Sequence, residues 1–96
     1  MKMLMIVYNE AMDNEVMEAL ESCVMKNYTK ISKVFGRGAS SGTHLGNDIW
    51  PGLNNIIYIV CEETQIKKML SVVRELRKEV GHEGIKAFVL PVEEVS

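Results

Sequence analysis

The sequence has few of the residues that mark small disulfide-rich or proline-rich proteins. It contains 2 cysteines and 2 prolines among its 96 residues. Two cysteines cannot supply the disulfide framework with which small secreted domains compensate for a small core. Cys23 and Cys61 fall at apolar positions of predicted elements, so we expect both to be reduced core thiols rather than a disulfide or a reactive pair.

Long apolar runs and a surplus of positive charge are also missing. No run approaches the roughly 20 residues needed to span a bilayer, and the amino terminus lacks the apolar segment and cleavage site of a signal peptide. We therefore expect a cytoplasmic protein that is not inserted in a membrane. The net charge of −2 argues against general nucleic-acid binding, which needs lysines and arginines gathered on one face.

The residues that are present fit one globular domain. Hydrophobic residues make up 47% of the chain and charged residues 25%, close to the average for such domains. We therefore expect a single domain over residues 1–96. A domain of this size buries only about two thirds of the surface that its unfolded chain exposes, so it would gain stability from oligomerisation.

Apolar patterning predicts four strands. Continuous apolar runs at 3–8 and 56–61 are typical of strands in the interior of a sheet. A mixed pattern at 27–35, with Tyr, Thr, Ile, Val and Phe among polar residues, predicts a half-exposed strand. A last short run predicts a strand at 85–90.

Apolar residues at helical spacing predict two helices. The first would begin at a cap at Asp13 or Asn14 and run through Cys23, and the second would begin at a cap at Thr64 and stop at Gly81. The resulting order, βαββαβ, predicts an α+β fold of the ferredoxin-like type, with both helices on one face of a four-stranded antiparallel sheet. The other face would be bare and apolar, so we expect oligomerisation to cover it.

A polar, glycine-punctuated loop at 36–54 interrupts the pattern of strands. Loops of this length are uncommon in compact domains unless they are functional or disordered. Within it, His44 and Asp48 could ligate a metal or polarise a small ligand, and Trp50 could stack on a ring or base. The alternatives are a solvated histidine and a tryptophan that anchors a turn. The loop is nevertheless the strongest candidate for a binding region.

Two segments resemble the PII-type nitrogen-regulatory signalling proteins. FGRG at 35–38 is similar to the GFGRQ stretch that precedes the long T-loop of that family. GHEGIKAFVLPVEEV at 81–95 is similar to the family's GDGKIFVLPVE-like stretch at the last strand. The opening strand and helix are also similar in length and pattern, so the resemblance covers nearly the whole chain.

The resemblance implies a trimer of ferredoxin-like subunits whose sheets line the inside. Small effectors such as adenine nucleotides would lie in clefts between neighbouring subunits, and the T-loop would change shape to control a partner protein. By matching position, Gly36, Arg37 and Gly38 would form the base of the T-loop beside a nucleotide cleft.

By the same match, Gly81, Gly84 and Lys86 would form the loop that cradles phosphates. Glycines let successive backbone N–H groups point at an anion while a lysine supplies charge at short range. Arg37 could add a planar fork to a phosphate or carboxylate. The alternative, from the residues alone, is a helix cap at Gly81, a turn residue at Gly84 and a solvated strand lysine.

The sequence also departs from the family pattern. Gly38 stands where the family has a glutamine that takes part in magnesium-dependent binding of 2-oxoglutarate, so that effector is not expected. The segment 39–55 is shorter than a full T-loop and contains no tyrosine, so the acceptor for uridylylation is missing. We therefore expect a divergent family member with a shortened T-loop.

These observations predict a regulator rather than an enzyme. The sequence shows no nucleophile elbow, Walker-type loop, HExxH helix or paired-cysteine zinc motif. We predict a trimer that binds a small anionic effector (ATP, ADP or AMP) and signals to a partner protein through the 36–54 loop. The alternative is a metal-handling trimer resembling the CutA-type cation-tolerance proteins, with His44, Asp48 or the amino-terminal methionines as ligands.

Overall fold

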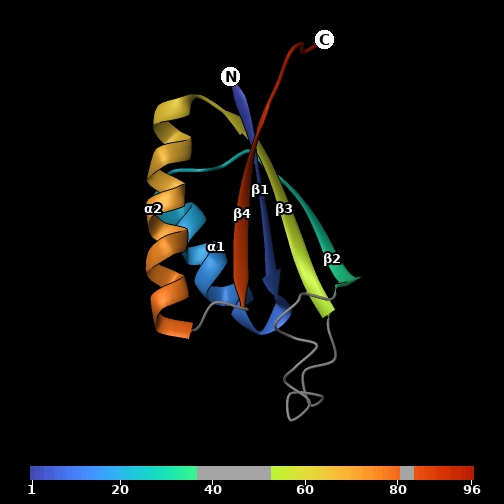
Figure 1. Cartoon of the computed structure of the whole chain (residues 1–96), viewed down its shortest axis with the longest axis vertical. Coiled ribbons are helices and arrows are strands. Elements are labelled where there is room, and N and C mark those ends of the chain that lie inside the picture. Colours follow the sequence, from blue (N-terminus) through green and yellow to red (C-terminus); the bar gives the residue numbers. More distant parts are fainter. Residues whose placement is uncertain (37–52, 81–83) are drawn as a thin grey trace.

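The computed structural model describes residues 1–36, 53–80 and 84–96. In chain order the elements are β1 (Lys2–Asn9), η1 (Glu10–Met12), α1 (Asp13–Ser22), β2 (Thr29–Phe35), β3 (Leu53–Cys61), α2 (Glu63–Val80) and β4 (Ile85–Pro91). The strands form one antiparallel sheet in the order β2-β3-β1-β4, and both helices lie on one face of it (Figure 1). The predicted ferredoxin-like fold is therefore confirmed.

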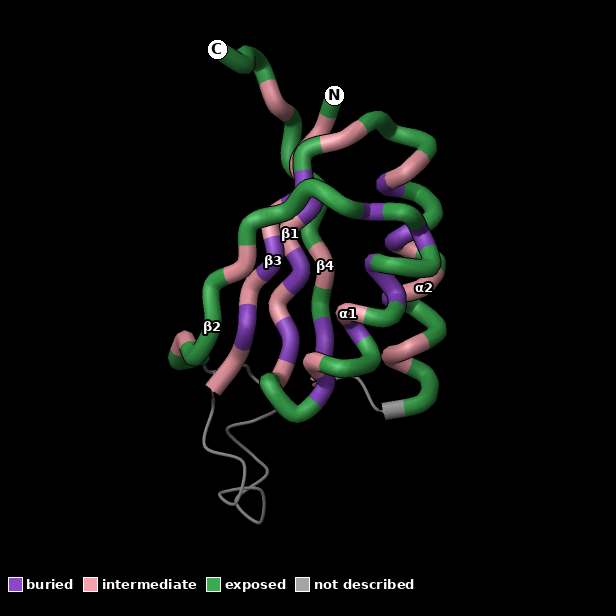
Figure 2. Tube along the Cα trace, turned by 180° about the vertical axis from the view of Figure 1, so that it is seen from behind, coloured by how far each residue is buried: buried purple, intermediate pink, exposed green. Residues whose placement is uncertain are grey.

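The two central strands present alternate residues to the two faces of the sheet. Leu4, Ile6 and Tyr8 of β1 are buried toward the helices, and Ile57 and Ile59 of β3 lie beside them in register. The alternation is visible along both strands in Figure 2. The apolar runs at 3–8 and 56–61 are thus interior strands, as predicted.

The helices complete the core from one side. α1 contributes Val16, Ala19 and Leu20, and α2 contributes Ile66, Met69 and Val73, all of which are buried. These positions repeat every three or four residues, which is the spacing of one helix face. Among the described residues, no helix is both long enough and apolar enough to cross a membrane.

Both cysteines are free thiols, as predicted. Cys23 is buried in the core, and Cys61 is half-buried against its edge. Burial, and then the negative charge of Glu62, raises the pKa of the Cys61 thiol. The thiol therefore stays protonated and unreactive at neutral pH.

The opposite face of the sheet is apolar and uncovered in the described chain. It is formed by side chains from all four strands: Met3, Met5, Val7, Ile31, Ile56, Tyr58, Val60, Phe88 and Leu90. Ile31, Val60, Phe88 and Leu90 are between 40% and 45% exposed. We call this surface the open face. Its existence agrees with the expectation from the sequence, whereas the assembly that would cover it stays a prediction.

Several predicted boundaries are wrong. β3 begins at Leu53. The predicted strand start at residue 56 therefore left Asn54 and Asn55 outside a strand that contains them, and the predicted loop 36–54 included its first two residues. α2 begins at Glu63, and the carbonyl of Glu62 accepts the first hydrogen bonds of the helix. Thr64 is therefore inside the helix rather than its cap.

The start of the first helix also differs from the prediction. A single turn of 3-10 helix, η1, precedes α1, and the side chain of Asn9 caps it by accepting the N–H of Ala11 at 2.9 Å. Asp13 is the first residue of α1, and no side chain caps that helix. The carboxylate of Asp13 does not cap because other side chains bind it.

Candidate functional site

The structure describes only part of the predicted ligand-binding set. Gly36, Gly84 and Lys86 lie in the described ranges. The other predicted site residues lie outside them: Arg37, Gly38, His44, Asp48, Trp50 and Gly81. Their roles, and the alternative in which His44 and Asp48 bind a metal, stay predictions. Within residues 1–36, 53–80 and 84–96, no group of three or more histidine, cysteine or acidic side chains could hold a metal ion.

β2 ends and β4 begins at one end of the sheet, opposite the two termini (Figure 1), and the described glycines adjoin these two strand ends. Gly36 directly follows β2, and a side chain there would collide with the side-chain amide of Asn54. Gly84 directly precedes β4, and its carbonyl accepts the N–H of Asn9 at 2.8 Å. The two glycine-containing segments therefore join the sheet at the same end, although on its two edge strands.

Lys86 lies on β4 opposite Val7 and is exposed. Its neighbours along the strand, Ile85 and Ala87, face the helices, so Lys86 belongs to the open-face side. An anion held by Lys86 would therefore approach from the side of the sheet that the helices do not cover.

The same end of the sheet carries a polar cluster around Asp13 that sequence reasoning missed. The Asp13 carboxylate accepts hydrogen bonds from the Tyr8 hydroxyl at 2.6 Å and from the Asn55 amide at 3.2 Å. The Lys30 ammonium lies 2.8 Å from one carboxylate oxygen and 3.0 Å from the other. These four residues, Tyr8, Asp13, Lys30 and Asn55, come from four different elements, and we call them the Asp13 cluster.

The cluster holds Asp13 in its charged form. Burial raises the pKa of the carboxyl, but the hydrogen bonds from Lys30, Tyr8 and Asn55 and the positive charge of Lys30 together lower it below its ordinary value. Burial, and then the hydrogen bond to Asp13, raises the pKa of the Tyr8 phenol. Because neither the Asp13 carboxyl nor the Tyr8 phenol is near its titration range at neutral pH, the cluster is unsuited to proton transfer.

A β-bulge lies directly beside the cluster. Between Ile31 and Val34 the pairing of β2 with β3 shifts by one residue, so that Ser32 and Lys33 both lie opposite Asn55. Lys33 has a φ of 58°, a left-handed conformation that costs a residue with a Cβ roughly 1–2 kcal/mol. The side-chain oxygen of Asn55 accepts the backbone N–H of Lys33 at 3.1 Å. This bond satisfies an N–H group that the bulge removes from the hydrogen-bond ladder of the sheet.

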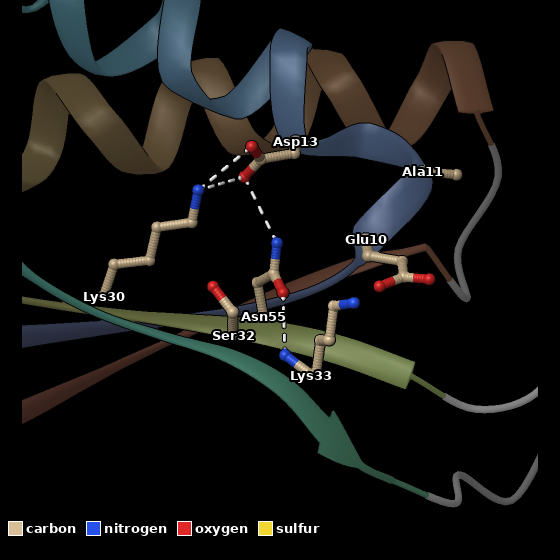
Figure 3. A pocket seen from close by; sticks show the side chains of 7 residues that line it. All are labelled: Glu10, Ala11, Asp13, Lys30, Ser32, Lys33 and Asn55. Atoms are coloured by element: carbon tan, nitrogen blue, oxygen red, sulfur yellow. Dashed lines mark hydrogen bonds and ion pairs between the residues drawn. The ribbon is translucent and has the colours of Figure 1, made fainter.

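The bulge and the cluster line a hollow of about 400 Å³ on the helix side of the sheet. Its lining consists of Glu10, Ala11, Asp13, Lys30, Ser32, Lys33 and Asn55. Figure 3 shows the chain of contacts from Lys30 through Asp13 and Asn55 to Lys33, with Glu10 on η1 across from the Lys33 side chain. The hollow therefore combines two lysines, two carboxylates and a fixed amide.

One sequence signal could have revealed this hollow. Asn54 and Asn55 directly precede an apolar run, and the sequence pattern alone leaves both outside the strand. A buried asparagine such as Asn55, 5% exposed, needs partners for both its donor and its acceptor. The partners are the Asp13 carboxylate and the backbone N–H of Lys33, and their proximity to Asn55 depends on tertiary structure.

We predict that Asp13→Asn lowers the free energy of unfolding at pH 7 by about 1–3 kcal/mol, because it removes the charge that holds Lys30 and Tyr8. Since folding lowers the pKa of Asp13, its contribution is complete above the ordinary value of 3.8. It is lost as the pH falls through the lower, folded-state pKa. Urea unfolding from pH 7 to acid should show a smaller acid-dependent loss in the variant than in the wild type.

The matched control is Glu15→Gln. It removes a carboxylate from the same first turn of α1, but Glu15 is exposed. The control should unfold at nearly the urea concentration of the wild type. Equal effects of the two substitutions would show that general charge on α1, and not the Asp13 cluster, sets the stability.

Solved structures with the same fold include PII-like proteins. CPII from Thiomonas intermedia K12, bound to ADP, AMP and acetate, matches with a TM-score of 0.71 at 19% identity, covering 93% of this chain and 82% of that chain. Its apo form matches with a TM-score of 0.69 at 16% identity, covering 92% and 84%. A PII-like signalling protein from Thermus thermophilus matches with a TM-score of 0.65 at 20% identity, covering 92% and 81%.

Structural likeness at these identities shows the fold, whereas the family is shown by sequence. A search of curated proteins gave no significant match. The family model described as nitrogen regulatory protein P-II matches residues 1–96. That range includes both segments on which the resemblance was based. The chain therefore belongs to the nitrogen regulatory protein P-II family.

Proposed function

We propose that the chain is a cytoplasmic, trimeric regulator that binds an adenine nucleotide between subunits and acts on a partner protein through residues 36–54. The observation that carries this proposal is the placement of Gly36 and Gly84 at one end of the sheet. The two P-II-like sequence segments, far apart along the chain, thereby meet the sheet at the same end, on its two edge strands. A regulatory loop and an effector site that act together would both lie at one end of the sheet.

The chemistry of the described residues supports a phosphate-bearing effector. Lys86 is an exposed ammonium beside β1, and Gly84 leads directly into its strand. A lysine next to a glycine-containing turn is a common way of binding phosphate, because charge and backbone N–H groups act on the same anion. The neighbour whose structure contains ADP and AMP shares this fold.

The open face supports assembly. Apolar side chains from four strands form one continuous surface, and contiguous apolar surfaces of this kind mark interaction sites. Membership of the P-II family favours a trimer over other assemblies. Clefts at the seams between subunits would then border the exposed Lys86 side of each sheet.

Signalling requires that the effector distinguish two states of the protein. A ligand shifts a conformational equilibrium only by the difference in its affinity for the two states. Because β2 ends at Phe35 and β3 begins at Leu53, an effector bound at this end of the sheet lies near the point where residues 36–54 join it. The partner protein would read which state of that segment is populated. The proposal assigns no chemical step to the chain.

We expect ATP, ADP or AMP to bind the wild-type protein and Lys86→Ala to weaken that binding by about tenfold or more, since a charge-assisted contact to phosphate is lost. Isothermal titration calorimetry with each nucleotide measures the effect. Lys67→Ala, which removes an exposed lysine from α2, is the matched control and should bind like the wild type. Absence of heat and of thermal stabilisation with all three nucleotides would contradict the nucleotide proposal.

The trimer makes a separate prediction. Light scattering should give the mass of three chains for the wild type, and Phe88→Glu should shift the mass toward one chain because it buries a charge in the seam. Val95→Glu introduces the same charge in the carboxyl-terminal segment, where Val95 is 66% exposed. This control should leave the mass unchanged. A monomeric wild type at all concentrations would rule out clefts between subunits.

A further inference from the structure

The hollow beside the Asp13 cluster is separate from the proposed nucleotide site. Lys30 pairs with Ile57 in the sheet, and Ile57 faces the helices in the core. Lys86 lies on the open-face side, on the opposite edge strand. The sheet itself therefore stands between the two places, and a ligand in the hollow would not be the nucleotide.

Two positive and two negative side chains line the hollow, but among the described residues only one of each forms an ion pair. Lys30 and Asp13 form an ion pair at 2.8 Å. Glu10 and Lys33 also line the hollow, but within the described parts of the chain neither side chain takes part in an ion pair. One free carboxylate and one free ammonium thus face the same space, and Figure 3 shows the Lys33 side chain rising from β2 toward η1, where Glu10 lies.

The backbone of Lys33 is arranged so that its side chain points into this space. A bulge re-aims the side chain of the extra residue, and here the conformation is left-handed at a residue that disfavours it. Asn55 holds the bulge through the N–H of Lys33, and Asp13 in turn holds the Asn55 amide. Strained residues held by buried polar groups concentrate at ligand sites.

We propose that the hollow binds a free α-amino acid, with its carboxylate on the Lys33 ammonium and its ammonium on the Glu10 carboxylate. A simple anion would be attracted by Lys33 but repelled by Glu10. A simple cation would be attracted by Glu10 but repelled by Lys33. A zwitterion satisfies both charges at once. The Ser32 hydroxyl, which also lines the hollow, offers a further hydrogen bond.

The size of the hollow fits a small amino acid. Its volume of about 400 Å³ lies near the lower end of the roughly 300–1,000 Å³ typical of small-molecule sites. The Asp13 cluster forms the floor, and its hydrogen bonds and ion pair hold Asp13, Lys30 and Asn55 in fixed positions relative to one another. The ligand therefore meets groups that need not rearrange, apart from two exposed side chains at the rim.

The site also lies close to the proposed regulatory loop. Lys33 precedes Gly36 by three residues on the same strand. A ligand that fixes Lys33 would fix the direction in which β2 leads toward residues 36–54. The proposal itself does not depend on nucleotide binding, and its test is done without nucleotide.

The test is a titration of ¹⁵N-labelled wild-type protein with glycine, L-alanine and L-glutamine, followed by two-dimensional NMR. We expect saturable shifts at the backbone amides of Glu10, Ser32 and Lys33 at millimolar concentrations. Acetate and methylammonium, which carry one charge each, should bind about tenfold or more weakly than the amino acids. Acetate binding as tightly as the amino acids, or no saturable shift with any amino acid, would overturn the proposal.

Two variants remove one ligand contact each and keep the fold. Lys33→Gly deletes the ammonium and replaces a strained residue with one that adopts a φ of 58° readily. Glu10→Gln deletes the negative charge of an exposed side chain. Each should weaken amino-acid binding about tenfold or more. Unchanged binding in both would overturn the assignment.

The matched control for Lys33→Gly is Val24→Gly. Val24 has a φ of 57° and is exposed at the other end of the sheet, so the substitution relieves the same backbone conformation away from the hollow. It should bind the amino acids like the wild type. A loss of binding equal to that of Lys33→Gly would overturn the proposal, because the effect would then come from the backbone alone.

Discussion

The negative charge of Asp13 is the interaction that this end of the molecule depends on. Its carboxylate binds Tyr8 at the end of β1, Lys30 on β2 and Asn55 on β3, while its backbone begins α1. Four elements that are far apart in the sequence are thereby fixed to one group. Because the carboxylate is only partly exposed, its attraction for Lys30 is screened less than that of a surface ion pair.

The effect of Asp13 reaches the edge of the sheet through Asn55. The amide has a donor and an acceptor, and each has a separate use: the donor binds Asp13 and the acceptor binds the N–H of Lys33. An aspartate or a hydrophobic residue in its place could not serve both. The buried amide thus connects the start of a helix with a bulge on β2, three residues before the segment that we propose as the regulatory loop.

The fold could be predicted from the sequence because it depends on patterns that are local. The apolar runs of β1 and β3 and the helical spacing in α2 each specify their element without reference to the rest. The boundaries were harder. Asn54 and Asn55 are residue types common in loops, and they belong to a strand only because they pair with β1. Asp13 is a residue type common at helix caps, but the partners of its side chain are distant in the sequence.

The candidate site also has one part that the sequence could predict and one part that it could not. Gly36, Gly84 and Lys86 were predicted as site residues because short motifs contain them, and their place at one end of the sheet follows from the strand order. Their role in binding stays a prediction. The hollow was not found, because it depends on a shift of one residue in the pairing of β2 with β3. No single residue signals that shift, and the sequence around it contains no glycine at the position that adopts a left-handed conformation.

That missing glycine is informative about the bulge. Glycine at position 33 would accept a φ of 58° without the cost of roughly 1–2 kcal/mol that a side chain brings. If the bulge served only to shift the pairing of β2 with β3 by one residue, glycine would be the more stable choice at position 33. Val24 shows that the chain tolerates such a conformation elsewhere, but its side chain is apolar and exposed and offers no charge to a ligand. At Lys33 the retained side chain is an ammonium directed at a hollow that also contains an unpaired carboxylate, and its backbone is held by a buried amide. The conformational cost at Lys33 is therefore explained if its ammonium binds a ligand in the hollow.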